Sequence, residues 1–134
     1  MNPVFLDTSG LVAVANVSDQ WHGQAVKAWA RLIDTSRPLL TTSLVLIELA
    51  DGLASVRQRQ LAISIVDRLN NSSKVEVVKV SREIETEAWA LYRQRPDKEW
   101  GMTDCISMPV MKMHGVKEVF TPAEPFLLPG YNGP

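Results

Sequence analysis

The sequence predicts an α/β domain with a mostly parallel central sheet of about four to five short strands. Three observations support this fold class. Short apolar runs alternate with longer segments of helical periodicity, which is typical of parallel strands joined by helices. The chain has 134 residues, of which 46% are hydrophobic, enough to bury one substantial core. No repeat or linker interrupts the pattern, so we expect a single domain over residues 1–134.

The first elements follow from apolar spacing. Residues 3–6 (PVFL) predict a buried strand, since proline is tolerated where a strand begins. A short helix is predicted over 9–16. An amphipathic helix is predicted over 18–33, with Ser18 or Asp19 as its cap.

The middle of the chain repeats this alternation. A strand is predicted at 39–41, and the helix over 43–54 is apolar on nearly every side, which favours a helix enclosed by protein. A helix over 56–69 ends at a cluster of asparagines and serines. The mostly apolar residues 75–80 predict a third strand.

Ser81 is placed to cap the next predicted helix, 82–93. Five residues of this helix are expected to be buried: Ile84, Ala88, Trp89, Leu91 and Tyr92.

The last third begins with a polar loop, 94–102. Thr103 is the predicted cap of a helix that runs to His114 and that Pro109 should bend. A final strand is expected at 116–120. The tail after it, 121–134, contains four prolines and two glycines and predicts irregular structure.

Composition narrows the possible functions. The formal net charge is −1, so binding to nucleic acid would require a local basic patch. Cys105 is the only cysteine, which excludes an intramolecular disulfide and the zinc-finger spacings. With no basic leader and no apolar run long enough for a membrane helix, we expect a cytoplasmic protein without a membrane partner.

Three acids stand where a parallel sheet presents its ligands. Asp7 directly follows the first strand, Glu48 lies early in the helix after the second, and Asp104 lies in the first turn of the helix after Thr103. In such sheets the ligand crevice lies at the carboxyl ends of the strands. Simpler explanations stay open: a turn at Asp7, a solvated helix stripe for Glu48, and the helix dipole for Asp104.

Three motifs together carry a family resemblance: LDTS at 6–9, IELADGL at 47–53 and WGMTDCIS at 100–107. In order and spacing they resemble the PIN-domain ribonucleases, in particular the VapC-like toxins of type II toxin–antitoxin modules. The resemblance implies a three-layer α/β/α PIN-like fold. It also implies a metal-dependent endoribonuclease that hydrolyses RNA phosphodiester bonds.

The same resemblance implies a site and partners. The catalytic and metal-binding residues would be Asp7, Glu48 and Asp104, which would hold Mg²⁺ or Mn²⁺. Carboxylate oxygens are hard ligands suited to these ions, and the cation would relieve the repulsion between converging acids. The expected partners are an RNA substrate, a cognate antitoxin protein and a second copy of the chain in a homodimer.

One motif departs from the family pattern. Such proteins usually carry a further acid after the last strand, and this sequence reads TPAEPF at 121–126. Ala123 occupies the matching position, and Glu124, one residue further on, is a possible substitute. We therefore expect one metal ion rather than two. A catalytically impaired PIN-like module that binds RNA or protein is the alternative function.

Hydroxyl groups flank the acids. We expect Ser9 and Thr103 to support the acids by hydrogen bonds, with helix capping as the competing explanation. Ser107 lies three residues after Asp104, on the same side of its helix. A phosphatase with Asp7 as nucleophile is less well supported, because its usual second acid is replaced by Ser9.

Basic and apolar residues suggest contact surfaces. Four basic residues near the loop before Asp104 are candidates for contacts to RNA phosphates: Arg82, Arg93, Arg95 and Lys98. Asp97 and Glu99 lie among them and reduce the net positive charge, so an ordinary solvated loop is an alternative explanation. Five apolar residues of the early helices are candidates for a partner surface: Trp21, Trp29, Leu53, Val56 and Leu61. For Trp29 and Trp89 we expect ordinary core packing.

Overall fold

The computed structural model describes residues 2–122 and 127–129. Within them one sheet has the strand order β3-β2-β1-β4-β5. The strands are β1 (Val4–Leu6), β2 (Leu39–Thr42), β3 (Val75–Val78), β4 (Glu118–Phe120) and β5 (Leu127–Pro129). Strands β1 to β4 are parallel, and β5 pairs antiparallel with β4. The predicted mostly parallel sheet is confirmed.

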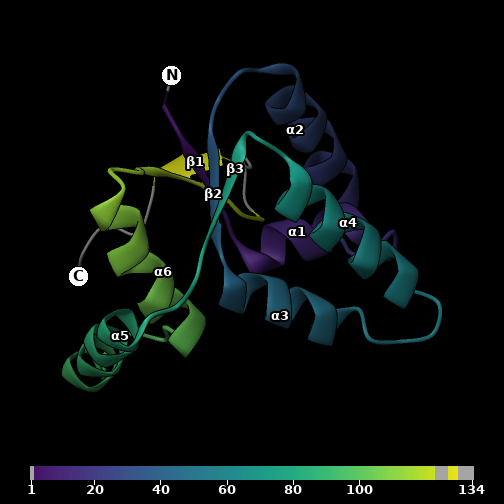
Figure 1. Ribbon diagram of the computed structural model, residues 1–134. Helices are drawn as coiled ribbons and strands as arrows, with labels where there is room; N and C mark the ends of the chain where they lie inside the picture. Colours follow the sequence, from purple (N-terminus) through teal and green to yellow (C-terminus); the bar gives the residue numbers. More distant parts are fainter. Residues whose placement is uncertain (1, 123–126, 130–134) are drawn as a thin grey trace.

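Helices cover both faces of this sheet. They are α1 (Thr8–Ala15), α2 (His22–Asp34), α3 (Ser43–Gly52), α4 (Arg59–Asn71), α5 (Arg82–Gln94) and α6 (Met102–Met113). Figure 1 shows α5 and α6 on one side of the sheet and α1, α2 and α4 on the other. The expected three-layer α/β/α arrangement is therefore confirmed.

The centre of the core is β1. All three of its side chains, Val4, Phe5 and Leu6, are fully buried, because the strand lies between β2 and β4 and is covered on both faces. This burial explains why the strand is a continuous apolar run rather than an alternating one. Phe120 of β4 is also fully buried and packs against Trp29, with ring centroids 5.6 Å apart.

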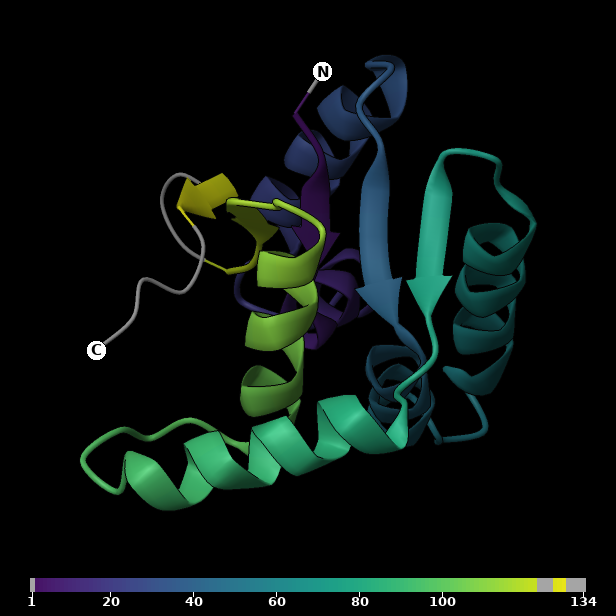
Figure 2. The ribbon, with the colours of Figure 1, turned by 60° about the vertical axis from the view of Figure 1, so that its left-hand side comes forward.

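The order of the strands locates the ligand crevice. The chain moves from β1 outward to β2 and β3, then returns past β1 to form β4. The reversal falls between β1 and β4, and the crevice of such a sheet lies beyond the carboxyl ends of these strands. Figure 2 shows β2 and β3 pointing toward α3 and toward α5, which crosses beyond their ends.

Several element boundaries differ from prediction. The helix expected from residue 18 begins at His22, because the Asp19 carboxylate accepts a hydrogen bond from the Trp21 backbone N–H at 2.8 Å and so stabilises a turn. The helix expected from 56 begins at Arg59. Ser81 caps α5 as predicted, accepting from the Ile84 backbone N–H at 3.2 Å.

Two burial predictions for α5 are wrong. Ile84 and Ala88 are buried, but Trp89 and Tyr92 are 39% and 47% exposed. Helix α5 packs mainly against α6 and not directly on the sheet, so only one narrow stripe is covered. Helix α3 is likewise not enclosed, since Ile47 is 58% exposed.

The prediction of an irregular tail over 121–134 is also wrong in part. Residues 127–129 form β5, whose backbone pairs with all of β4. The proline at 129 is compatible with this position, because β5 is the edge strand of the described sheet. No helix within the described ranges is long and apolar enough to cross a bilayer.

Candidate active site

The three predicted acids line one pocket of about 490 Å³. Asp7 comes from the end of β1, Glu48 from α3 and Asp104 from the start of α6. The pocket thus lies at the carboxyl ends of the parallel strands, beside the reversal between β1 and β4. Segments that are distant in sequence meet there because β1 is the central strand.

Asp7 is held in place by both neighbouring strands. The Leu6 carbonyl accepts a hydrogen bond from the Thr41 hydroxyl of β2 at 2.9 Å. The Asp7 backbone N–H donates to the Phe120 carbonyl at the end of β4, at 3.3 Å. Asp7 precedes α1, but its carboxylate makes no capping hydrogen bond to that helix. Its side chain lines the pocket.

Gly10 of α1 lies against Phe120 of β4, and the absence of a side chain permits this contact. A β-carbon there would lie 2.7 Å from Cδ2 of the Phe120 ring and would also overlap the Phe120 carbonyl oxygen. The same carbonyl accepts the Asp7 backbone N–H. Gly10 therefore helps to set the position of Asp7 relative to the end of β4.

The Asp7 carboxylate is buried, with 8% of the residue exposed. Its Oδ2 accepts hydrogen bonds from Ser9 Oγ at 2.8 Å and from Thr121 Oγ1 at 3.3 Å. Burial raises the pKa of Asp7; the bond from Ser9 opposes this shift and the negative charge of Asp104 adds to it. In the absence of a cation, the charged form of Asp7 is disfavoured.

This raised pKa makes a pH-dependent prediction. The pKa of Asp7 is higher in the folded protein than in the unfolded chain, where it is about 4. The resulting stabilisation is therefore fully present below about pH 4 and is lost as the pH rises through the pKa of the folded state. In metal-free buffer, the stability of wild type relative to Asp7→Asn should therefore fall from acidic to neutral pH. Urea unfolding of both proteins across this range measures the difference. A constant difference would contradict the assigned shift.

Glu48 is oriented by two threonines. Thr8 of α1 donates its hydroxyl hydrogen to Glu48 Oε1 at 2.9 Å, and Thr103 of α6 donates to Oε2. Carboxylate and hydroxyls thus tie three helices together at the pocket. The support expected from the Thr103 hydroxyl is present, directed to Glu48.

Thr103 is not the cap of its helix, contrary to prediction. Helix α6 begins one residue earlier, and Gly101 occupies the capping position. Asp104 Oδ2 accepts from the Gly101 backbone N–H at 3.0 Å. Asp104 therefore stabilises the start of α6 and also lines the pocket, so the structural and the functional explanations of this residue are compatible.

The other predicted hydroxyl and the substitute acid are placed differently. Ser107 is fully buried and donates to the backbone carbonyl of Thr103 at 2.8 Å, so its hydroxyl serves its own helix. Ala123 and Glu124 lie outside the described residues.

Two polar residues at the pocket were missed by sequence reasoning. Asp19 lines the pocket from the turn between α1 and α2, although its sequence context indicated only a cap. Thr121 follows β4 and binds Asp7. Its position just after a strand next to β1 was the available signal, since both strand ends meet at the same edge.

Mg²⁺ or Mn²⁺ fits part of the predicted ligand set. Asp7 and Asp104 interact electrostatically and supply hard oxygen ligands, and Mg²⁺ is commonly bound by one or two carboxylates together with waters. Across residues 2–122 and 127–129, however, no group of three or more His, Cys, Asp or Glu side chains is arranged to hold a metal. Glu48 is instead directed to its threonines.

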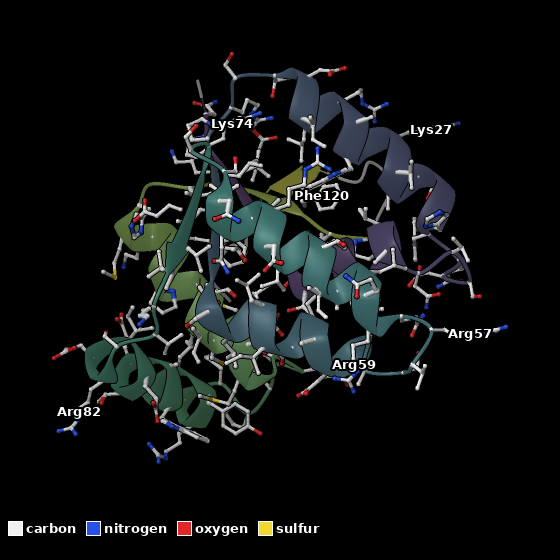
Figure 3. All side chains as sticks on the ribbon, turned by 45° about the vertical axis from the view of Figure 1, so that its right-hand side comes forward. Lys27, Arg57, Arg59, Lys74, Arg82 and Phe120 are labelled. Atoms are coloured by element: carbon white, nitrogen blue, oxygen red, sulfur yellow. The ribbon has the colours of Figure 1, made fainter. Side chains whose placement is uncertain are left out.

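The predicted RNA-contacting residues fall into two places. Arg82 begins α5, and Figure 3 shows it pointing outward from the molecule. Arg93, Arg95 and Lys98 lie at the other end of α5 and in the loop before α6. A helix of this length spans about 20 Å, so Arg82 is separated from the other three.

A three-layer α/β domain with an acid-lined pocket at the reversal of a parallel sheet defines the class of protein. The chain belongs to the PIN domain family, whose model matches residues 4–122. A protein named 23S rRNA-specific endonuclease VapC20, from Mycobacterium tuberculosis, is 26% identical over 117 residues, covering 87% of this chain and 86% of the relative.

Solved structures agree with this assignment. The crystal structure of Mycobacterium tuberculosis VapC20, described as a sarcin-ricin loop cleaving toxin, matches with a TM-score of 0.79 and 25% identity, covering 92% of each chain. VapBC2 from Rickettsia felis bound to a promoter DNA fragment matches with a TM-score of 0.63 and 17% identity, covering 92% of this chain and 90% of that one. At that identity, the second match supports the fold alone.

Proposed function

We propose that this protein is a metal-dependent endoribonuclease and the toxin component of a toxin–antitoxin system. The observation that carries the proposal is the meeting of Asp7, Glu48 and Asp104 in one pocket of a PIN domain. The similarity to a ribosomal RNA endonuclease over most of both chains supports RNA as the substrate.

The residues at the pocket would have different roles in cleavage. Asp7 and Asp104 would hold a Mg²⁺ or Mn²⁺ ion, which when bound would stabilise the charge that develops on the phosphate and acidify a water. Glu48, fixed through Thr8 and Thr103, would orient the attacking water and accept a proton at a carboxylate oxygen. Ser9 and Thr121 would keep Asp7 in one orientation.

Metal binding can be tested apart from cleavage. A ligand that binds only the native state stabilises it, by about 2.7 kcal/mol at a concentration 100 times its dissociation constant. We expect millimolar Mg²⁺ or Mn²⁺ to raise the melting temperature of the wild type but not of Asp7→Asn. Asp34→Asn is the matched control, because Asp34 is an exposed acid at the end of α2. Absence of a shift in the wild type would count against the metal site.

A second candidate function is a PIN-like module that binds RNA or protein without cleaving it. It is favoured by the absence, within the described part of the chain, of a group of three possible metal ligands. Ala123 at the usual position of a further acid also favours it. One measurement distinguishes the two functions. If the protein is a metal-dependent ribonuclease, purified wild type should cut RNA with Mn²⁺ and the cuts should disappear with chelator. If it is a binding module, it should bind RNA or protein without cutting RNA.

We propose two partners for this chain, an antitoxin protein and a second copy of the chain in a homodimer. The antitoxin is suggested by the likeness to VapC20, whose structure is described as that of a toxin. Exposed apolar side chains provide surface for an antitoxin or for a homodimer, in particular Val56, which is 95% exposed, and Ile47. Of the apolar residues predicted to form a partner surface, Leu53 is instead fully buried. Co-expression with the neighbouring open reading frame, followed by size-exclusion chromatography, tests both assemblies.

A further inference from the structure

A second pocket adjoins the acid pocket. It has a volume of about 450 Å³ and lies where the end of α5 and the loop at 95–101 meet the start of α6. Its lining includes Tyr92, Lys98, Trp100 and Cys105. Gly101 lines both pockets, so the two pockets are neighbours on the surface.

The indole of Trp100 is the main feature of this second pocket. Trp100 is half-buried and packs against the hydrophobic core, which restricts its motion. Two cations lie over its ring: Arg95 Cζ is 5.6 Å and Lys98 Nζ is 5.8 Å from the ring centroid. Such distances allow cation–π attraction.

The charges of the loop nearly cancel. Arg95 makes two hydrogen bonds to Asp97, at 3.0 and 2.9 Å, and its presence lowers the pKa of Asp97 to about 2. Glu99 also lines the pocket, opposite in charge to Lys98. Attraction of a ligand here would therefore come from the aromatic surface more than from net charge.

A further aromatic pair extends from the pocket along α5. Tyr92, which lines the pocket, contacts Trp89 edge to face, with ring centroids 5.8 Å apart. Arg93 lies over Trp89 at 5.7 Å from its ring centroid. These half-exposed rings, for which sequence reasoning expected burial, continue a surface in which aromatic and basic side chains alternate.

We propose that the pocket around Trp100 binds the base of an unpaired nucleotide adjacent to the phosphate that is cleaved. Alternating aromatic and basic side chains are the usual means of binding single-stranded nucleic acid, because every base can stack on an aromatic ring. The pocket volume falls within the range of about 300–1,000 Å³ typical of small-ligand sites. This inference rests on the proposed ribonuclease function and adds a substrate subsite to it.

A double-mutant cycle between protein and RNA tests the stacking. The parent protein is Asp7→Asn, which should bind RNA without cutting it. It is titrated against a short mixed-sequence single-stranded oligoribonucleotide and against copies in which one base at a time is replaced by an abasic site. Fluorescence anisotropy of the labelled oligonucleotide reports the dissociation constant.

Adding Trp100→Leu should weaken binding of the intact oligonucleotide about 5- to 150-fold, the range for loss of one stacked base. Trp100→Phe should retain most of the affinity, because it keeps an aromatic face. With the abasic copy that lacks the stacked base, Trp100→Leu should have little effect. Melting temperatures of all variants check that the fold is intact.

Several results would overturn the inference. Equal binding by Trp100→Leu and its parent would do so, as would the same loss with every abasic copy, which would indicate a structural role. Loss of antitoxin binding without loss of RNA binding would assign the pocket to the protein partner instead. If wild type cuts RNA and Trp100→Leu cuts it with unchanged KM, only the subsite fails; if wild type neither binds nor cuts RNA, the proposed function itself fails.

Discussion

Replacing Asp7 by asparagine should abolish RNA cleavage while leaving the protein folded. The amide has nearly the same shape as the carboxylate but carries no charge, so it would no longer hold a cation beside Asp104. Loss of a group that merely supports a metal ligand already costs about 10–100-fold, so we expect a decrease of about 100-fold or more for a ligand. Cleavage of total RNA with Mn²⁺, followed by sequencing of the new RNA ends, provides the measurement.

The same substitution should not reduce the stability of the fold, although it reduces cleavage. Burial and the charge of Asp104 both disfavour ionised Asp7, so the metal-free Asp7→Asn protein should be at least as stable as wild type at neutral pH. An inactive variant with an undiminished melting temperature would separate a catalytic role from a structural one. Asp34→Asn, remote from the pocket, should retain both cleavage and stability. Asp104→Asn should lose cleavage as well, and retained activity in either pocket variant would refute the assignment.

Gly10→Ala should destabilise the fold by about 1–3 kcal/mol, the typical cost of overpacking a core. Alanine is intrinsically the better helix former, so propensity alone would predict the opposite sign. The close approach of Phe120 decides the sign, because both its backbone carbonyl and its ring occupy the space that a β-carbon would need. Urea unfolding of the metal-free protein measures the change.

Gly23→Ala provides the matched control. Gly23 lies in the first turn of α2, and an added β-carbon would meet nothing within 4 Å. Helix propensity then acts without opposition, so stability should rise by up to about 1 kcal/mol. Stabilisation by both substitutions would show that β4 can move away from α1 at little cost. In that case, Gly10 would not fix the position of Asp7.

Local sequence was sufficient for most of the architecture. An apolar run without alternation identified β1 as a strand buried on both faces, and Ser81 correctly marked the start of α5. The acids at a strand end, in the second turn of α3 and in the first turn of α6 were recognisable as candidates because parallel strands present their carboxyl ends at one edge. Each of these features depends on residues that are close together in the chain.

Exposure was harder to predict. The spacing of Trp89 and Tyr92 along α5 indicated a buried face, but periodicity reports which residues share a face and not whether another layer covers it. Helix α5 rests on α6, so part of that face is exposed. The same reasoning applies to β5, since a short strand at an edge has little signal of its own and depends on pairing with β4.

The fold class and the element order were determined by the sequence alone, because they follow from periodicity, caps and strand ends. The three acids were candidates by their positions, and the resemblance of their motifs to a known family selected them. Only the tertiary structure decided which groups the acids touch. Glu48 is bound by hydroxyls 40 residues before it and 55 residues after it, and Asp7 by Thr121, 114 residues away. The order of the strands brings these side chains together, and that order is set by packing of the whole chain rather than by any one segment.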